Sequence, residues 1–534
     1  MLPSTLILGV AICGLFICIK FLVEGTLTTT VGLRSEASKK QDSMTHFAYQ
    51  IHYLKNRFKG LSYLFHGPEV IEKAYAQANG RPFLVATPSN NHVLVTTNEL
   101  MREIADASPA SLSLHAVAKE LLQPKHTMHG FEWQNQRGLE GTGFVRALRS
   151  LLTSHLAYFQ PSIDSIIRTC LREELSTPGG NGFTQVHIFP MMKRIVTRVN
   201  CFIFFGEELS QKAEFTAAAL EFPQSVIFAA EILRITPSFL RSIVASLATG
   251  KHRAAKTLFR HLEPIVKERM AKRANPDLNR NSPLPVDCTQ WLIDTSPRKN
   301  PWSPARMIGE IIAVWFSTVH QLSMTATYLI EDLCLHEEYL APLKEELRQH
   351  VATSSKASID IERLPLLDSF IKESIRCTNA DAVSCRRKAL VDYVLDDGTR
   401  VARGDWVCIP QRAMMHDPNR FSRPHEFDGF RFARANASLR AGNHSAEVPD
   451  NSPASLTTAN HDWPIWGLGI AACPGRFYAS LVLKLIVVQV LDEWECKLPD
   501  KDGPRSMVWR SSVVPRNDTR VLFRRQSERH LEAS

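Results

Sequence analysis

A segment near the C-terminus, Trp466 to Ala479, constrains the fold of this chain more than any other part. It reads Trp-Gly-Leu-Gly-Ile-Ala-Ala-Cys-Pro-Gly-Arg-Phe-Tyr-Ala, and an apolar run follows it. Gly467 and Gly469 let the backbone turn tightly and approach a flat ligand closely. Pro474 suits the first position of a helix, which would make Cys473 its N-cap. Backbone N–H groups and the positive helix end would then stabilise a thiolate at Cys473.

The plainer interpretation of Cys473 is a small core residue, which is the usual role of a buried cysteine beside glycines. The whole pattern is more specific than Cys-Pro-Gly alone, and a thiolate against a planar cofactor suits haem iron. The segment resembles the cysteine-ligand loop of the cytochromes P-450. The resemblance implies that Cys473 is the axial ligand of a haem b and that Gly467 and Gly469 belong to the haem-binding loop.

Two further motifs precede the cysteine in the order of that family. Glu373 and Arg376 are spaced i, i+3, so they share one face of a predicted helix and can pair. Arg431 follows in the segment Asp-Gly-Phe-Arg-Phe. By resemblance the three residues form a buried charged triad that holds the core near the haem. An E-x-x-R pair on an exposed helix would contribute little to stability.

The haem propionates need cationic partners, because buried carboxylates require pairing. The family often has Arg or His two residues before the cysteine, where this chain has Ala471. Arg387 matches the strand arginine that often takes this role. Trp133 and Arg137 resemble the family's W-x-x-x-R pair and are further candidates, with Arg146 and Arg149 as competitors. Any of these four residues can instead lie on the face of a surface helix.

Residues 304–335 form one long, mostly apolar run, which predicts a helix buried on most sides. In the family its middle reads small-Gly-x-acid-Thr, and the acid and the alcohol relay protons to iron-bound dioxygen. Ser317, Thr318, His320 and Gln321 occupy those positions here. A histidine on an apolar helix is more often a hydrogen-bonded core residue. We interpret His320 and Gln321 as residues that organise a proton-delivering water.

The N-terminal apolar run is long enough to nearly span a bilayer. Basic residues follow it and none precede it, so the positive-inside rule predicts that the bulk of the protein is cytosolic. A cleaved signal peptide is the rival interpretation. The predicted organisation is a luminal N-terminus (1–5), a transmembrane anchor (6–23), a linker (24–59), one haem domain (60–525) and a tail (526–534).

Composition narrows the class of protein. The 534 residues carry a net charge of +9, without a basic cluster interleaved with aromatics that would indicate nucleic-acid binding. This charge suits an ordinary solvated surface, an anionic membrane or an acidic redox partner. The eleven scattered cysteines argue against a disulfide framework.

Hydrophobic periodicity predicts a mostly α fold with small β-sheets, an α+β P-450-like domain. Strands are expected at 83–86, 92–96, 393–395 and 406–409, a helix at 97–106, and helices through 144–272 with breaks at 178–180 and 236–237. Residues 274–303 and 433–460 are expected to be loops, and 508–514 with 520–523 a final hairpin. The segments expected to line a substrate pocket are 108–128, 225–245 and 378–384.

The leading hypothesis is a haem-thiolate monooxygenase of the endoplasmic reticulum membrane, single-pass, with its catalytic domain in the cytosol. It would take electrons from NADPH through NADPH-cytochrome P-450 reductase. Its substrate would be a lipophilic small molecule (terpenoid, sterol or polyketide-like) of secondary metabolism, and the wording of the motifs resembles filamentous-fungal members. The altered residues His320 and Gln321 motivate a second hypothesis, a haem-thiolate isomerase or dehydratase that needs neither O2 nor reductase. The third is a non-catalytic haem- or ligand-binding protein.

Overall fold

The structure is a computed structural model, and it describes residues 60–131, 143–177, 179, 182–275, 284–353, 361–443, 448 and 455–526. The predicted anchor 6–23, the linker 24–59 and residues 527–534 of the predicted tail lie outside the described residues.

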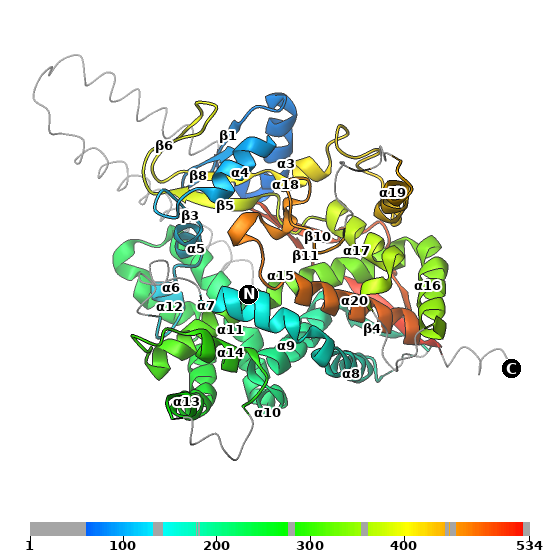
Figure 1. Cartoon of the computed structure of the whole chain (residues 1–534), viewed down its shortest axis with the longest axis horizontal. Helices are drawn as coiled ribbons and strands as arrows, with labels where there is room; N and C mark the ends of the chain where they lie inside the picture. Colours follow the sequence, from blue (N-terminus) through cyan, green and yellow to red (C-terminus); the bar gives the residue numbers. More distant parts are fainter. Residues whose placement is uncertain are drawn as a thin grey trace, which may run out of the picture.

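One long helix, α15 (Pro304–Leu335), runs through the core, as the sequence predicts (Figure 1). Ser303 caps its first turn by accepting a hydrogen bond from the Arg306 N–H, and Pro304 supplies a preset backbone angle at the start. Most of its residues are buried, because it packs against α9 (Ile188–Phe205), α13 (Arg253–Ala274) and α20 (Arg476–Glu493). A helix surrounded in this way is apolar on nearly every face.

Further helices, all shorter than α15, make up much of the remaining described structure. They are α3 (Ser62–Ala78), α4 (Asn98–Asp106), α5 (Leu114–Leu122), α6 (Pro124–Thr127), α7 (Gly143–Arg146), the π-helical turn η1 (Ala147–Leu152), α8 (Leu156–Glu174), α10 (Glu207–Ser210), α11 (Ala213–Ile235), α12 (Arg241–Ala248), α14 (Cys288–Thr295), α16 (Leu340–Thr353), α17 (Pro365–Cys377), α18 (Gln411–Met415) and α19 (Arg431–Arg440).

A five-stranded sheet lies to one side of the helices (Figure 1). Its strand order is β1 (Phe83–Ala86), β2 (Asn91–Leu94), β8 (Trp406–Ile409), β5 (Ser384–Ala389) and β3 (Leu112–Ser113). Only β2 and β8 pair in parallel. The register of β5 against β8 shifts between Ser384 and Arg387, and Cys385 lies there with a φ of 49°. A bulge of this kind redirects the side chains that follow it.

The other strands form three small sheets. They are the three-stranded sheet of β4 (Thr184–His187), β12 (Arg520–Arg525) and β9 (Trp494–Lys497), the pair β6 (Tyr393–Val394) and β7 (Arg400–Val401), and the hairpin β10 (Ser506–Trp509) and β11 (Ser512–Pro515).

Three sequence predictions about local structure were wrong. The segment 274–303 contains α14, whose first turn is capped by Asp287 and whose apolar residues are buried. The segment 433–460 contains most of α19, which begins at the buried Arg431. Strand β12 is not the partner of 508–514: β10 pairs with β11, and β12 lies between β4 and β9. In each case contacts with distant segments override local composition.

Within the described residues, α11 alone is long and apolar enough to cross a membrane. It packs against α9, α13 and α15, and several of its apolar side chains are fully buried. Its composition is therefore that of a core helix.

Candidate active site

The loop before α20 is shaped by its two glycines. Gly467 and Gly469 both have positive φ, 78° and 59°, where a side chain would be strained. The turn between them brings the Cys473 N–H to the Trp466 carbonyl at 2.6 Å. The loop therefore closes on itself and holds Cys473 at its end, which agrees with the turn expected from the sequence.

The start of the helix after Cys473 differs from the sequence prediction. The first helical hydrogen bond runs from the Ala479 N–H to the Gly475 carbonyl, and α20 begins at Arg476 with Gly475 as its N-cap. Cys473 is therefore not the N-cap. The Gly475 N–H is instead a hydrogen-bond partner of the Cys473 side chain, so a backbone donor still serves the sulfur.

The charges around Cys473 favour a thiolate, but burial opposes it. Burial raises the pKa of the thiol above its ordinary value, while the Gly475 N–H and the charges of Arg476 and Arg149 lower it. Coordination to a metal ion removes the proton of a thiol, so binding of iron would give the thiolate despite the burial.

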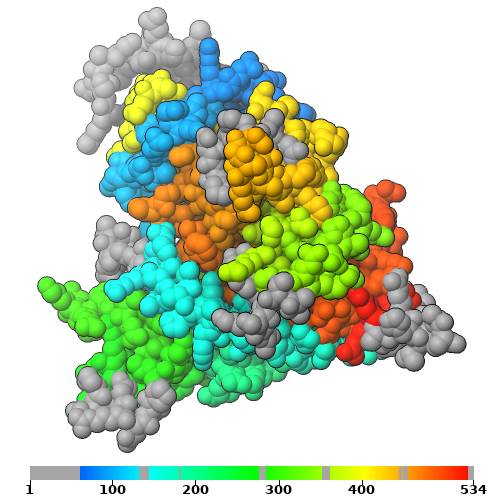
Figure 2. Space-filling view, turned by 45° about the vertical axis from the view of Figure 1, so that its right-hand side comes forward, coloured from blue at the N-terminus to red at the C-terminus, as the bar shows by residue number. Residues whose placement is uncertain are grey.

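Arg149 lies against the cysteine loop, and sequence reasoning named it only as an alternative propionate partner. Its guanidinium donates to the carbonyls of Ile470, at 3.0 Å, and Ala472, at 3.3 Å. Arg146 is exposed. Figure 2 shows the segment that contains this loop (orange) beside the blue segment of α4 and the cyan segment of η1, which agrees with the contacts of the loop with both. Trp133 and Arg137 lie outside the described residues.

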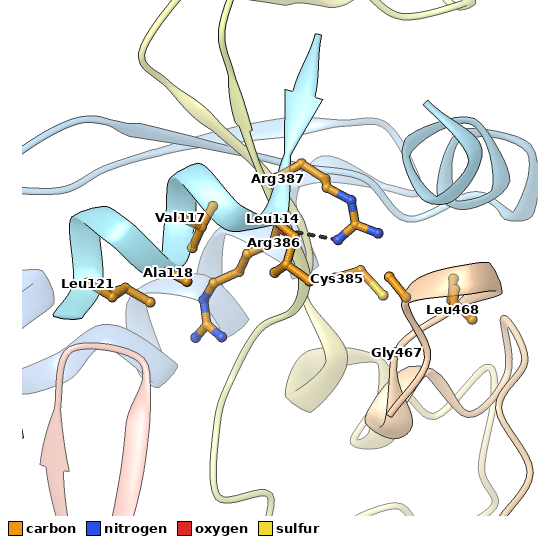
Figure 3. Close-up of a pocket in the computed structure, with 10 residues that line it drawn as sticks. Leu114, Val117, Ala118, Leu121, Cys385, Arg386, Arg387, Gly467 and Leu468 are labelled. Atoms are coloured by element: carbon orange, nitrogen blue, oxygen red, sulfur yellow. Dashed lines mark hydrogen bonds between the residues drawn. The ribbon is translucent and has the colours of Figure 1, made fainter. Parts of the chain in front are cut away.

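Arg387 faces a pocket of about 200 Å³ between α5, strand β5 and the cysteine loop (Figure 3). Arg387 is 5% exposed, and its guanidinium donates a hydrogen bond to the Arg386 carbonyl at 3.0 Å. Burial lowers its pKa, and none of the groups that raise it again is a carboxylate. Arg386, in contrast, pairs with Asp381.

The pocket beside Arg387 has one wall formed by the cysteine loop. Gly467, Leu468 and Ala471 line it, and Ala471 places only a methyl group there. A buried guanidinium without a carboxylate partner among the described residues fits an anionic group of a ligand. The site therefore fits the carboxylates of a haem.

Glu373, Arg376 and Arg431 meet in the core. Arg376 binds the Glu373 carboxylate through two hydrogen bonds of 2.8 Å, and Arg431 Nε lies 3.2 Å from the same carboxylate. All three side chains are buried. Burial alone would lower the pKa of Arg376, but the hydrogen bond and charge of Glu373 raise it above its ordinary value.

Most of the other hydrogen bonds of the two arginines go to backbone carbonyls of residues 415–426 (Met415, Ser422, Arg423, Pro424 and Glu426). The cluster therefore fixes the segment between β8 and α19 on helix α17. None of the hydrogen bonds named here reaches the cysteine loop. The cluster therefore stabilises the fold in this structure.

The middle of α15 has an unusual exposed face. Ser317 and Gln321 are exposed, although Val314, Trp315, Val319 and the residues from Leu322 to Met324 are buried. Ala313, one turn before Ser317, lines a pocket of about 60 Å³ with α5, α6 and Phe131. The predicted lining segment 108–128 thus contributes to this pocket, whereas 225–245 and 378–384 line neither of the two pockets described.

Two of the four polar side chains in this part of α15 donate hydrogen bonds to backbone carbonyls of the same helix. The Ser317 hydroxyl donates to the Val314 carbonyl at 2.7 Å, and the Thr318 hydroxyl to the Trp315 carbonyl at 2.9 Å. Their protons are therefore engaged by the backbone. Gln321 keeps an exposed amide, so it is the residue on this face with an unrestricted donor.

His320 lies mostly buried between helices. Burial lowers its pKa to about 4, with a further contribution from Lys193, and a hydrogen bond to the Pro223 carbonyl opposes the shift. Its Nε2 has no hydrogen-bond partner among the described residues. Nδ1 is then the nitrogen that donates to Pro223, and the neutral ring presents an unprotonated Nε2. Such an atom can accept a hydrogen bond but cannot supply a proton by itself, and it is buried from solvent in this structure.

Comparisons with known proteins agree with this arrangement. The family profile described as "Cytochrome P450" matches residues 73–523. "Cytochrome P450 monooxygenase AN1598" of Emericella nidulans is 27% identical over 85% of this chain and 83% of its own length. "Ent-kaurene oxidase P450-4" of Gibberella fujikuroi is 27% identical over 72% of this chain and 74% of its own.

Among solved structures, a retinoic acid-bound cyanobacterial CYP120A1 superposes with a TM-score of 0.65. It covers 88% of this chain and 96% of its own, at 18% identity. This likeness shows the mostly α fold with small sheets.

Proposed function

Since this chain belongs to the cytochrome P450 family, we propose that it is a haem-thiolate monooxygenase that inserts one oxygen atom of O2 into a lipophilic small molecule. The observation that carries the proposal is Cys473, held at the end of a closed glycine loop with a backbone N–H at its sulfur. The balanced reaction is R–H + O2 + NADPH + H⁺ → R–OH + H2O + NADP⁺. A membrane reductase would pass the two electrons of NADPH one at a time.

The haem supplies the cleavage of the O–O bond when it is bound. Cys473 would hold its iron, and Gly467 and Gly469 would let the backbone lie close to the ring. Arg387 would pair with a propionate, because it is a buried cation that faces a pocket at the cysteine loop. Trp133 and Arg137 stay in our proposal as further propionate partners.

Gln321 and His320 would hold the water that delivers protons on the substrate side. The support on the Gln321 side is an exposed amide on α15, which can both donate to and accept from a water. The neutral imidazole of His320 would accept from this water at Nε2, which is buried, so the water would have to enter the helix packing there. Ser317 can only accept from this water, because its proton is used by Val314.

The name of the relative "Ent-kaurene oxidase P450-4" supports a terpenoid-like substrate and a place in fungal secondary metabolism. We further propose that residues 6–23 anchor the protein in the endoplasmic reticulum membrane with its domain in the cytosol. The apolar run followed by basic residues supports this orientation.

The decisive experiment is the absorption spectrum of the reduced, carbon monoxide-bound protein, wild type beside Cys473→Ser. We expect the strongly red-shifted Soret band of a thiolate-ligated haem in the wild type and its loss in the variant. A Soret band at the ordinary position, or no bound haem in a folded protein, would contradict the proposal.

Gln321 stands where the family usually has Thr, and this difference favours a second candidate function, a haem-thiolate isomerase or dehydratase. Such an enzyme keeps the same spectrum but needs no external electrons. Turnover of a candidate substrate with and without reductase and NADPH separates the two. Product formed only with both supports the monooxygenase.

A further inference from the structure

A buried asparagine, Asn200, joins three helices near the candidate site. It lies on α9 with 0% exposure. Its Nδ2 donates to the Thr318 carbonyl of α15 at 3.0 Å, and its Oδ1 accepts from the Tyr478 hydroxyl of α20 at 2.7 Å. The orientation of the amide follows from chemistry, because a carbonyl can only accept and therefore must face Nδ2. Both ends of the side chain are thus satisfied inside the core.

Tyr478 connects this contact to the cysteine loop. It lies five residues after Cys473, in the first turn of α20. Burial raises its pKa well above the ordinary value, and the neighbouring Cys288 and Cys201 raise it further. The phenol is therefore protonated at any working pH and donates its hydrogen to Asn200. The start of the helix that follows the proposed iron ligand is thereby tied to α9.

Thr318 lies in the part of α15 that presents Ser317 and Gln321. Inside an α-helix each carbonyl accepts from the N–H four residues later, so the Thr318 carbonyl serves Leu322 as well as Asn200. The carbonyls of Val314 and Trp315 likewise accept from the hydroxyls of Ser317 and Thr318. Of the three extra donors to these carbonyls, Asn200 is the one that comes from another helix.

We propose that Asn200 is a positioning residue that, together with Tyr478, sets where α15 presents Ser317 and Gln321 relative to the Cys473 loop. The proposal rests on the haem-thiolate function. A displaced Gln321 would misplace the proton-delivering water, and electrons would then leave as peroxide instead of entering product.

The main test compares wild type, Asn200→Leu, Tyr478→Phe and the double variant N200L/Y478F as full chains. Asn200→Leu removes both hydrogen bonds and leaves the Tyr478 hydroxyl buried without an acceptor, so it also lowers overall stability. The double variant removes that stranded hydroxyl. If Asn200 only stabilised the fold, the double variant would recover both its stability and the wild-type behaviour of α15. If Asn200 positions α15, the double variant recovers its stability but α15 stays displaced.

Tyr328→Phe is the matched control. Tyr328 is also a buried tyrosine on a core helix, and it loses one hydrogen bond, to Ser506 at 2.9 Å. It lies near the C-terminal end of α15, away from Ser317.

Two measurements decide the outcome. Amide hydrogen exchange over residues 315–323 is expected to accelerate about five-fold in the Asn200→Leu and double variants, the change expected from one lost buried hydrogen bond. Exchange over 326–333 is expected to stay at the wild-type rate. With reductase and NADPH, the share of electrons released as peroxide is expected to rise in both variants and to stay unchanged in Tyr328→Phe.

The proposal would be overturned if the double variant exchanged at the wild-type rate over 315–323. It would also be overturned if the acceleration over 315–323 were matched over 326–333 and in Tyr328→Phe. The carbon monoxide spectrum keeps the two proposals apart. A missing red-shifted band in the wild type would refute the haem-thiolate function, while the exchange data would still decide whether Asn200 holds α15.

Discussion

Arg387 and Ala471 line the same pocket from opposite elements, a buried guanidinium on β5 and a methyl group on the cysteine loop. The β-bulge before Arg387 and the left-handed Cys385 redirect this end of β5. Position 471 carries no positive charge, and Arg386, the other cation of this pocket, pairs with Asp381. Arg387 is therefore the cation of this pocket without a carboxylate partner among the described residues.

Replacing Arg387 by Met is expected to weaken haem retention. Loss of one hydrogen bond to a charged group costs about 1.5–3 kcal/mol, which corresponds to about 10- to 100-fold faster loss of haem. Transfer of haem to an excess of apomyoglobin measures this rate. Ala471→Arg in the Arg387→Met background is expected to restore retention, and Arg400→Met, at an exposed position, to have no effect. Retention equal to wild type in Arg387→Met would refute the pairing.

Replacing Glu373 by Gln is expected to destabilise the protein by about 3–5 kcal/mol, because two buried arginines lose their anion. Urea unfolding followed by circular dichroism measures the free energy. The matched control is Glu345→Gln, which breaks an exposed pair of the same i, i+3 spacing with Arg348 and is expected to cost less than about 1 kcal/mol. Similar losses in both variants would show that the buried cluster contributes no more than a surface pair.

Lys372 is expected to make stability rise with pH. Its ammonium is buried between the rings of Phe432 and Trp463, 4.6 Å from each centroid. Burial lowers its pKa to about 7, with Asp368 opposing the shift. Between this value and the ordinary 10.5 the unfolded chain binds more protons than the folded one, so stability increases with pH across that window.

The variant Lys372→Met removes this dependence. Relative to wild type it is expected to be most stabilised near pH 7, and the difference is expected to shrink by at most about 1.4 kcal/mol for each pH unit up to about 10. Urea unfolding at several pH values measures the difference. The matched control is Lys497→Met, at a lysine that also lies over a ring but is half exposed. A difference for Lys372→Met that does not change with pH would contradict the assignment.

His320 is expected to act without titrating between pH 6 and 8, because its pKa is about 4. His320→Gln is expected to raise the peroxide share by a factor that is constant over this range, and Gln321→Ala to raise it as well. Peroxide and NADPH are measured in parallel at each pH. Unchanged peroxide in both variants would remove the water-relay hypothesis, and a step in the His320→Gln ratio near pH 6.5 would show that the imidazole is charged during turnover.

Much of the architecture followed from local patterns. The apolar run from Pro304 to about Leu335 predicted α15, and the glycines at 467 and 469 predicted the tight turn before Cys473. The helix expected at 97–106 is α4 (Asn98–Asp106), and the Thr97 side chain caps its first turn. Such features depend on residues a few positions apart, which periodicity and capping describe well.

Asn200 was not found from the sequence, although one signal was available: an amide within the mostly apolar segment 195–205. A buried amide must find partners, but nothing local shows that they lie on α15 and α20. Arg149 was noticed and its partner was not, because the carbonyls it binds are more than 300 residues away.

The sequence by itself determined the order of the three motifs, the chemistry that Cys473 can provide and the long buried helix, because these depend on residue type and short spacing. Only the tertiary structure decided that β12 joins β4 and β9, that α20 starts after Gly475, that Arg387 faces Ala471, and that Asn200 joins Thr318 to Tyr478. The physical reason is that buried polar groups take whichever partner the packing of distant segments brings within hydrogen-bonding distance.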